Sequence, residues 1–191
     1  MSIAGFIFWA IIAITIAYVI AIYNGLVTLK HNVSKAWANI DVLLKQRHDE
    51  LPKLVETCKQ YMRFEQETLE KVMKARSSVA SAQQQGDMAA LGQAEGTLRL
   101  GLGSLFAVAE AYPDLKADET FQHLQARITG LENTIADRRE FYNESVNVNN
   151  VRIEQFPDVI IARFFNFKPH ALLEFTDQEK SDVNVAQLFN S

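Results

Sequence analysis

Cysteine is almost absent from this chain, which has Cys58 alone. A lone thiol excludes an internal disulfide framework and a multi-cysteine zinc site. Glycine and proline are also scarce, with 8 and 4 residues, and no stretch alternates β-branched and polar residues with the period of two that strands need. Long stretches are instead rich in Ala, Leu, Glu, Gln, Lys and Arg. These features predict an all-α chain.

Recognisable chemistry is also missing. The formal net charge is −4 and no basic stripe is present, so we expect no nucleic-acid partner. None of the four histidines has a glutamate three residues before it, which a di-iron site in a helical bundle needs, and there is no HExxH motif. The sequence GLGS at 101–104 has no preceding strand and is no phosphate loop. We therefore predict no enzyme, and no catalytic, cofactor-binding or metal-binding residue.

Charge is absent from the first 29 residues, and the first charged side chain is Lys30. Residues 3–23 form an almost unbroken apolar run, and roughly 20 helical residues cross a bilayer core of about 30 Å. A cleaved signal peptide would carry a basic start and a shorter apolar stretch. We expect residues 1–25 to be a retained transmembrane anchor in contact with membrane lipids.

Basic residues follow this run and none precedes it. Lys30, Lys35, Lys45 and Arg47 lie after the apolar segment. Positive residues stay on the cytoplasmic side of a membrane. The expected topology is a single pass, with a short N-terminus outside and the rest of the chain in the cytoplasm.

A stripe of apolar residues spaced by threes and fours leaves the anchor and passes through Pro52 without losing phase. Either Pro52 marks a tight turn of an up-and-down bundle, or it kinks one long helix. A turn would draw the Asn-rich end of a later, longer helix into lipid, where polar groups are costly. We favour the kinked helix, and the stripe extends it to about Ala80.

Three further segments complete the predicted architecture. Residues 81–87 form a loop with Gly86 as the breaker, and a helix follows from about Met88 to Ala111. The next helix runs from near Ala117 to Phe156 and places Arg138 on its inward face. The predicted domains are the anchor at 1–25, an antiparallel cytoplasmic helical bundle at 26–157, and a C-terminal tail at 158–191. The tail packs on the bundle, on a neighbour or on the membrane.

The part of the stripe next to the membrane predicts self-association. Burying each large apolar side chain is worth roughly 1.5–3 kcal/mol, and the short second helix does not reach this part of the first one. An exposed apolar stripe normally marks a partner surface, and a second copy is the simplest partner. We hypothesise a homo-oligomer whose interface, here named the apolar seam, consists of Leu26, Val33, Trp37, Ile40, Leu44 and Leu51.

Two polar clusters have structural interpretations. The charged run at 47–50 lies beside Pro52 and is typical of a solvated or capping face. The corner formed by Glu110, Tyr112, Pro113 and Asp114 stops one helix and starts the next, with Asp114 or Asp118 as the cap. A docking epitope for a partner is the alternative for this corner.

Several blocks resemble one family closely. They are AWANIDV at 36–42, RHDELPKLVET at 47–57, EAYPDLKA at 110–117 and YNESV at 142–146. Together they resemble the LemA family, and the similarity runs from Tyr23 to about Phe175. The resemblance implies a bacterial inner-membrane protein with one N-terminal transmembrane helix, a helical cytoplasmic domain and no established catalytic activity. It also implies relatives in magnetosome membranes and others associated with HtpX-type membrane metalloproteases.

Two functions agree with these observations. The first is a non-enzymatic scaffold that self-assembles and organises or shapes the inner membrane. The alternative is an adaptor or regulator of a membrane metalloprotease, and this alternative rests on the family resemblance alone.

Overall fold

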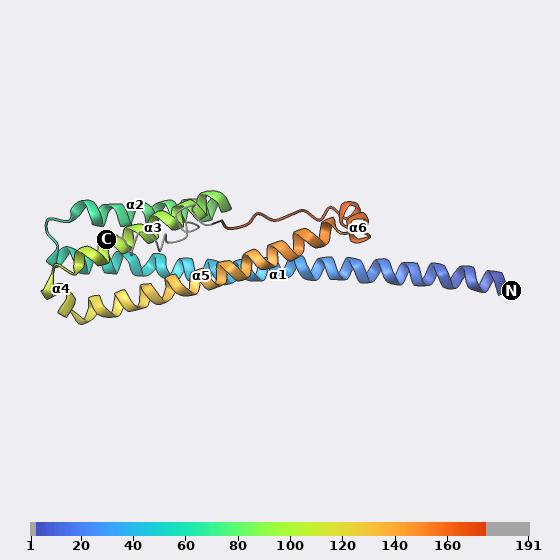
Figure 1. Ribbon diagram of the computed structural model, residues 1–191, viewed down its shortest axis with the longest axis horizontal. Coiled ribbons are helices and arrows are strands. Elements are labelled where there is room, and N and C mark those ends of the chain that lie inside the picture. The colour runs from blue at the N-terminus through green and yellow to red at the C-terminus, as the bar shows by residue number, and fades with distance from the viewer. Residues whose placement is uncertain (1–2, 175–191) are drawn as a thin grey trace, which may run out of the picture. The chain divides into compact units, whose positions relative to one another are not determined.

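The computed structural model describes residues 3–174, and its regular structure there is entirely helical (Figure 1). The helices are α1 (Ile3–Tyr61), α2 (Gln66–Gln85), α3 (Met88–Ala109), α4 (Pro113–Ala117), α5 (Glu119–Glu154) and α6 (Asp158–Phe164). The predicted all-α class is confirmed, as is the long N-terminal helix that continues into a helical bundle.

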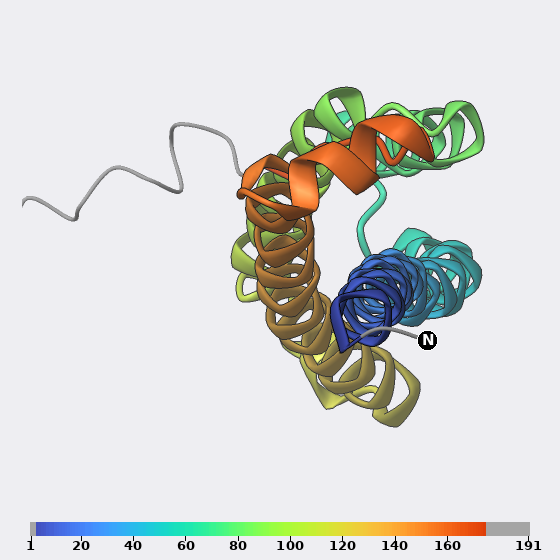
Figure 2. The same ribbon diagram turned by 90° about the vertical axis from the view of Figure 1, so that its right-hand side faces the viewer.

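The helix α1 passes through Pro52 without ending, so the alternative of a tight turn there is wrong. In Figure 2, α1 is seen nearly end-on and its turns follow one another from blue to cyan without a break. A proline inside a helix costs about 3 kcal/mol or more. Leu51 and Leu54, on either side of Pro52, have no exposed surface, and their burial offsets this cost.

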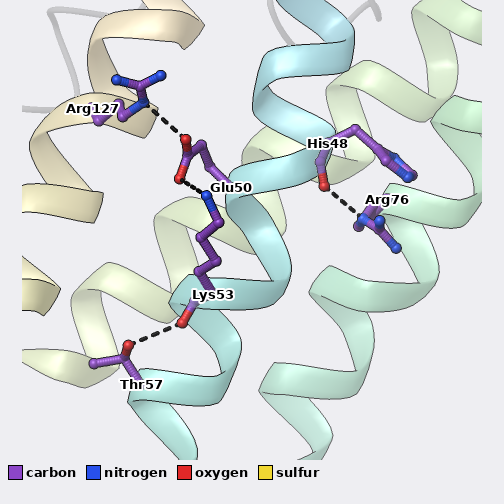
Figure 3. A network of polar contacts seen from close by, with 6 residues as sticks. All are labelled: His48, Glu50, Lys53, Thr57, Arg76 and Arg127. Carbon is purple, nitrogen blue, oxygen red and sulfur yellow. Dashed lines mark hydrogen bonds and ion pairs between the residues drawn. The ribbon is translucent and has the colours of Figure 1, made fainter.

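The backbone defect at Pro52 is repaired by another helix. Proline has no amide hydrogen, so the carbonyl of His48, four residues earlier, loses its partner within α1. The Nε of Arg76, on α2, donates to that carbonyl oxygen at 2.9 Å (Figure 3). Leaving this part-buried carbonyl without a donor costs up to about 1–3 kcal/mol. The hydrogen bond from Arg76 therefore offsets part of the free-energy cost of Pro52 within the continuous helix.

The expected extension of the first helix to about Ala80 is wrong, because α1 ends at Tyr61 and α2 begins at Gln66. The segment between them contains no glycine or proline. Tertiary contacts hold this turn: Tyr61 Oη donates to Asp118 at 3.0 Å, and Tyr112 Oη donates to Glu65 at 3.4 Å. The helix α2 then packs along α3 (Figure 1).

The predicted breaker at Gly86 is correct, although the loop is shorter than residues 81–87. Gly86 has a φ of 67°, a left-handed conformation that glycine adopts without strain. It ends α2, and Asp87 caps α3 by accepting a hydrogen bond from the Ala90 amide at 3.0 Å.

The C-terminal half differs from expectation in its details. The short helices α4 and α6 were not predicted, because neither is long enough to show a period. Arg138 is exposed, and the buried arginine is Arg139, at 5% exposure. Phe156 is 81% exposed and does not belong to the buried stripe. This stripe otherwise has the predicted spacing from Phe121 to Ile153.

The described residues form two compact units. The first comprises residues 3–40 and 138–172, and the second comprises residues 41–137 and 173–174. The predicted division into an anchor, a bundle and a tail stays a prediction. The tail from residue 175 onward lies outside the described residues.

We predict that Arg76 matters only because residue 52 is proline. Arg76→Leu should lower the free energy of unfolding by about 1–3 kcal/mol, because the His48 carbonyl then lacks a donor. In a Pro52→Ala background the restored amide donates to this carbonyl, and the same substitution should cost less than about 1 kcal/mol. Denaturant unfolding of the full chain in detergent micelles measures this cycle.

The control for this cycle is Lys71→Leu, which removes an exposed lysine of α2 that pairs with the exposed Glu67. Its cost should be below about 1 kcal/mol in both backgrounds. An equal loss for Arg76→Leu with and without Pro52 would contradict the repair of the backbone.

Candidate functional site

The N-terminal part of α1 presents apolar side chains to its surroundings on all sides. Ile3, Phe6 and Trp9 are 83%, 72% and 60% exposed, and Tyr18 is 55% exposed. The helix α1 is the only described helix that is long and apolar enough to cross a membrane. Such a surface is unfavourable in water and favourable in lipid, because a helix satisfies its own backbone groups. It is a candidate membrane span.

The apolar seam, in contrast to the N-terminal part of α1, is buried by the chain itself. Leu26 and Ile40 have no exposed surface, and Val33, Leu44 and Leu51 are each at most 2% exposed. In the first unit, Ile22 and Leu26 share a cluster with Ile153 of α5 and Ala162 of α6.

Trp37 of the apolar seam is half-buried, and its ring lies 5.8 Å from that of Tyr142. The premise that a single chain leaves this stripe bare is therefore wrong. Only the short second helix was considered as a cover, whereas Tyr142 and Ile153 of α5 and Ala162 of α6 pack on this part of α1. The burial removes the argument for an oligomer interface at these six residues. Self-association through another surface stays a prediction.

A buried ion network crosses the second unit. Arg47 of α1 is 1% exposed and pairs with Glu95 of α3 and Glu132 of α5. The expected solvated face at 47–50 is therefore wrong, since Glu50 is also buried, at 9% exposure. Burial would lower the pKa of Arg47, but the two carboxylates outweigh this effect and raise the pKa. The guanidinium therefore stays charged and ties three helices together.

Around this network the polar contacts continue along α1 (Figure 3). Glu50 accepts from Arg127 of α5 at 3.0 Å and from Lys53 at 3.2 Å. Burial and the charge of Arg76 lower the pKa of His48, so this imidazole is neutral at pH 7. Each buried charge here has an opposite charge beside it, as such groups need. The arrangement fixes helix register.

Sequence reasoning did not identify Glu95 and Glu132 as partners of Arg47. A signal was present for Glu95, because it lies four residues after Leu91 and three before Leu98, on the buried stripe of α3. A carboxylate on a buried stripe requires a cation. The stripe alone does not say which cation meets it.

The predicted corner is a tight helix–turn–helix junction in the structure. Pro113 begins α4, where its missing amide and fixed φ are tolerated. Glu110 pairs with Lys116, and Tyr112 donates to Glu65. Asp118 caps α5 by accepting from the Phe121 amide at 2.8 Å, whereas Asp114 is exposed. These contacts favour the structural role of the corner. The docking alternative has no support from them.

Cys58 has no exposed surface. Burial raises the pKa of this thiol to about 12. The reactive species of a cysteine is the thiolate, so the side chain packs as a small apolar group. Among residues 3–174, no group of three or more His, Cys, Asp or Glu side chains is arranged to hold a metal ion.

We predict that Arg47→Leu lowers the free energy of unfolding by about 3–5 kcal/mol at pH 7, because two carboxylates are left buried without a cation. Combining this change with Glu95→Leu and Glu132→Leu should restore most of the stability. Denaturant unfolding of the full chain measures each variant.

The matched control for Arg47 is Lys45→Met, which breaks an exposed pair with Asp41 at 3.2 Å. Exposed pairs contribute at most about 1 kcal/mol. The network would have no stabilising role if Arg47→Leu cost no more than this control.

We also predict that Cys58 resists alkylation in the folded chain. With a pKa of about 12, about one thiol in ten thousand is ionised at pH 8. Iodoacetamide should react slowly with native protein and rapidly in urea, and the native rate should keep rising beyond pH 9. The comparison is Ser77→Cys in a Cys58→Ala background, at an exposed position of α2. Equal native rates at the two positions would rule out a buried, protonated thiol.

Comparison with known proteins finds relatives that match most of this chain. Protein LemA of Metamycoplasma hominis is 26% identical over 187 residues, covering 97% of this chain and 84% of the relative. Magnetosome protein MamQ 2 of Paramagnetospirillum magneticum is 25% identical over 198 residues, covering 91% of this chain and 72% of the relative. Magnetosome protein MamQ of Magnetospirillum gryphiswaldense is 24% identical over 169 residues, covering 76% of this chain and 62% of the relative.

A family model described as the LemA family matches residues 36–186, which is most of the chain. The match begins within α1, next to Trp37, and includes the ion network and the helix corner. The resemblance found in the sequence is thereby confirmed, and the chain belongs to the LemA family.

Proposed function

We propose that this chain is a non-enzymatic scaffold of the bacterial inner membrane, held by one transmembrane helix. One observation carries the proposal: within α1, most residues up to Ala21 expose their apolar side chains, whereas the chain itself buries one apolar stripe between Leu26 and Cys58. The first part therefore needs lipid and the second does not. The polar remainder of the chain is positioned beside a membrane.

The proposed topology places the short N-terminus outside and the helical units in the cytoplasm. It is supported by Lys30, Lys35 and Lys45, which follow the apolar run, whereas no basic residue precedes it. Two of the relatives described above are named magnetosome proteins. Their names associate those proteins with an organelle, which supports a role in membrane organisation for this chain.

Self-assembly, the second part of the proposal, requires a surface other than the apolar seam. In the first unit, α1 and α5 border a groove of about 350 Å³ that contains Leu29, Phe141 and Val148. Phe141 and Val148 are 51% and 46% exposed, and Val151 further along α5 is 44% exposed. Their spacing places these side chains on one face of the helix. We propose that a second copy packs on this face.

We expect mass photometry of the full chain, solubilised in mild detergent, to show a discrete assembly. The double variant Phe141→Glu with Val148→Glu should reduce it to monomers, because charges would be buried in the contact. Circular dichroism should show unchanged helicity. The control is Leu100→Glu, which places a charge at a residue that is 60% exposed on α3, and the assembly should persist.

A wild-type chain that is monomeric throughout would contradict the scaffold. The alternative, an adaptor for a membrane metalloprotease, predicts a monomer that co-purifies with a protease of the HtpX type.

A further inference from the structure

A pocket of about 500 Å³ lies in the first unit, where α1 leaves its apolar run. It is bordered by Tyr23, Val27, Lys30 and His31 of α1, by Asn149 of α5, and by Phe165, Asn166, Phe167, Lys168 and His170 after α6. The segments that border it are well separated in sequence and come together through the packing of α6.

The helix α6 is fixed at this level of α1. Ala162 of α6 shares a cluster with Ile22 and Leu26. The Tyr23 ring lies 4.7 Å from that of Phe165 and 5.9 Å from that of Phe167. Arg152 also holds the start of α6 by donating to Asp158 at 2.8 Å. The pocket therefore lies at the level of Tyr23 along the axis of α1.

Tyr23 marks the end of the apolar run, so the pocket lies at a membrane boundary. The run from Ile3 to Tyr23 has about the length that crosses a bilayer core of about 30 Å. Tyrosine is enriched at the level of lipid headgroups. Side chains that line this pocket are therefore placed where phosphate groups are found.

The charge of the pocket suits an anion. Lys30 and Lys168 both border it, His31 and His170 contribute imidazoles, and no carboxylate is among the residues that line it. Among the described residues, neither lysine forms an ion pair, in contrast to Lys45, which pairs with a carboxylate of α1. Two uncompensated cations beside a membrane attract anionic lipid.

The side chains beside the pocket favour a lipid over a dissolved anion. Phe156 and Phe164 are both 81% exposed, and Ile160 between them is 56% exposed. Phe156 lies in the turn before α6, and Ile160 and Phe164 lie on α6. A short apolar surface of this kind at the level of the headgroups is typical of segments that lie in the membrane interface. In water these three side chains would remain hydrated at a cost.

We propose that this pocket binds the headgroup of an anionic phospholipid, with Lys30 and Lys168 on the phosphate and the acyl chains along the exposed part of α1. The exposed face of α6 enters the same interface beside the bound lipid. This inference rests on the membrane anchoring proposed above. It adds a lipid class to that function and names the residues that select it.

Native mass spectrometry of the full chain, stripped of lipid in detergent, tests the lipid class. Phosphatidylglycerol should bind more tightly than phosphatidylcholine. Lys30→Gln combined with Lys168→Gln should weaken phosphatidylglycerol binding by about five-fold for each lysine removed. The charge-matched control is Lys35→Gln with Lys45→Gln, which removes two lysines that do not border the pocket and should change binding less than about two-fold.

Three outcomes of this titration would overturn the proposal. They are equal binding of the two lipids, an equal effect of the two double variants, and displacement of phosphatidylglycerol by millimolar inorganic phosphate. The last outcome would identify a general anion site.

A second measurement tests the place of the pocket in the membrane. In a Cys58→Ala background, a fluorophore is attached at Phe164→Cys or at Ala38→Cys, and the full chain is reconstituted in phosphatidylglycerol vesicles. Lipids brominated near the headgroup should quench the label at position 164. The label at 38 is the control, because the exposed Ala38 lies about four turns of α1 beyond Tyr23, away from the level of the pocket.

Equal quenching at the two positions would overturn the proposal, and so would contact between labels of two copies in place of quenching by lipid. Extraction of the vesicles with alkaline carbonate separates these outcomes from a failure of anchoring. A chain that stays in the vesicles with an unquenched label at position 164 is anchored and lacks the proposed lipid site. A chain released by carbonate lacks the anchor itself.

Discussion

A single uninterrupted helix carries two apolar surfaces that need different surroundings. In α1 the residues up to Ala21 are open on all sides, and the residues from Leu26 to Cys58 form a stripe buried by the chain's own helices. Burying each large apolar side chain is worth roughly 1.5–3 kcal/mol. The continuity of α1 therefore joins the candidate membrane span directly to the buried stripe.

This coupling requires that α1 tolerate two residues that would ordinarily interrupt a buried helix. Arg47 brings a charge into the core, and Pro52 leaves the His48 carbonyl without its usual donor. Both are compensated from distant parts of the chain, by Glu95 and Glu132 in the first case and by Arg76 in the second. Each compensation works in one register of the helices only. The two sites therefore stabilise this arrangement of α1, α2, α3 and α5 against sliding.

Periodicity predicted which residues of the long helices are buried, but it did not predict what buries them. The stripes of α1 and α5 and the breaker Gly86 follow from spacing and backbone chemistry. The apolar seam was assigned to a second copy because spacing contains no information about tertiary partners. Arg47 shows the same limit, since its burial depends on carboxylates that lie 48 and 85 residues away.

The short elements could not be predicted from the sequence, for a different reason. The turn after Tyr61 contains no breaking residue and is held by Asp118 and Tyr112 from another part of the chain. The helix α6 has only seven residues, too few to show a period. Its position beside Tyr23 is set by tertiary contacts, and the candidate lipid pocket depends on this position. The exposed apolar run of α1, in contrast, is a local property of composition and was predicted directly.

The buried stripe of α1 provides the most direct test of this account. Hydrogen–deuterium exchange can be measured on the full chain in nanodiscs that hold one copy and in membranes crowded with copies. If the chain covers its own stripe, the amides of residues 26–58 are equally protected in both. Rapid exchange of these amides in the single-copy nanodiscs alone would show that other copies bury the stripe, and would contradict the account.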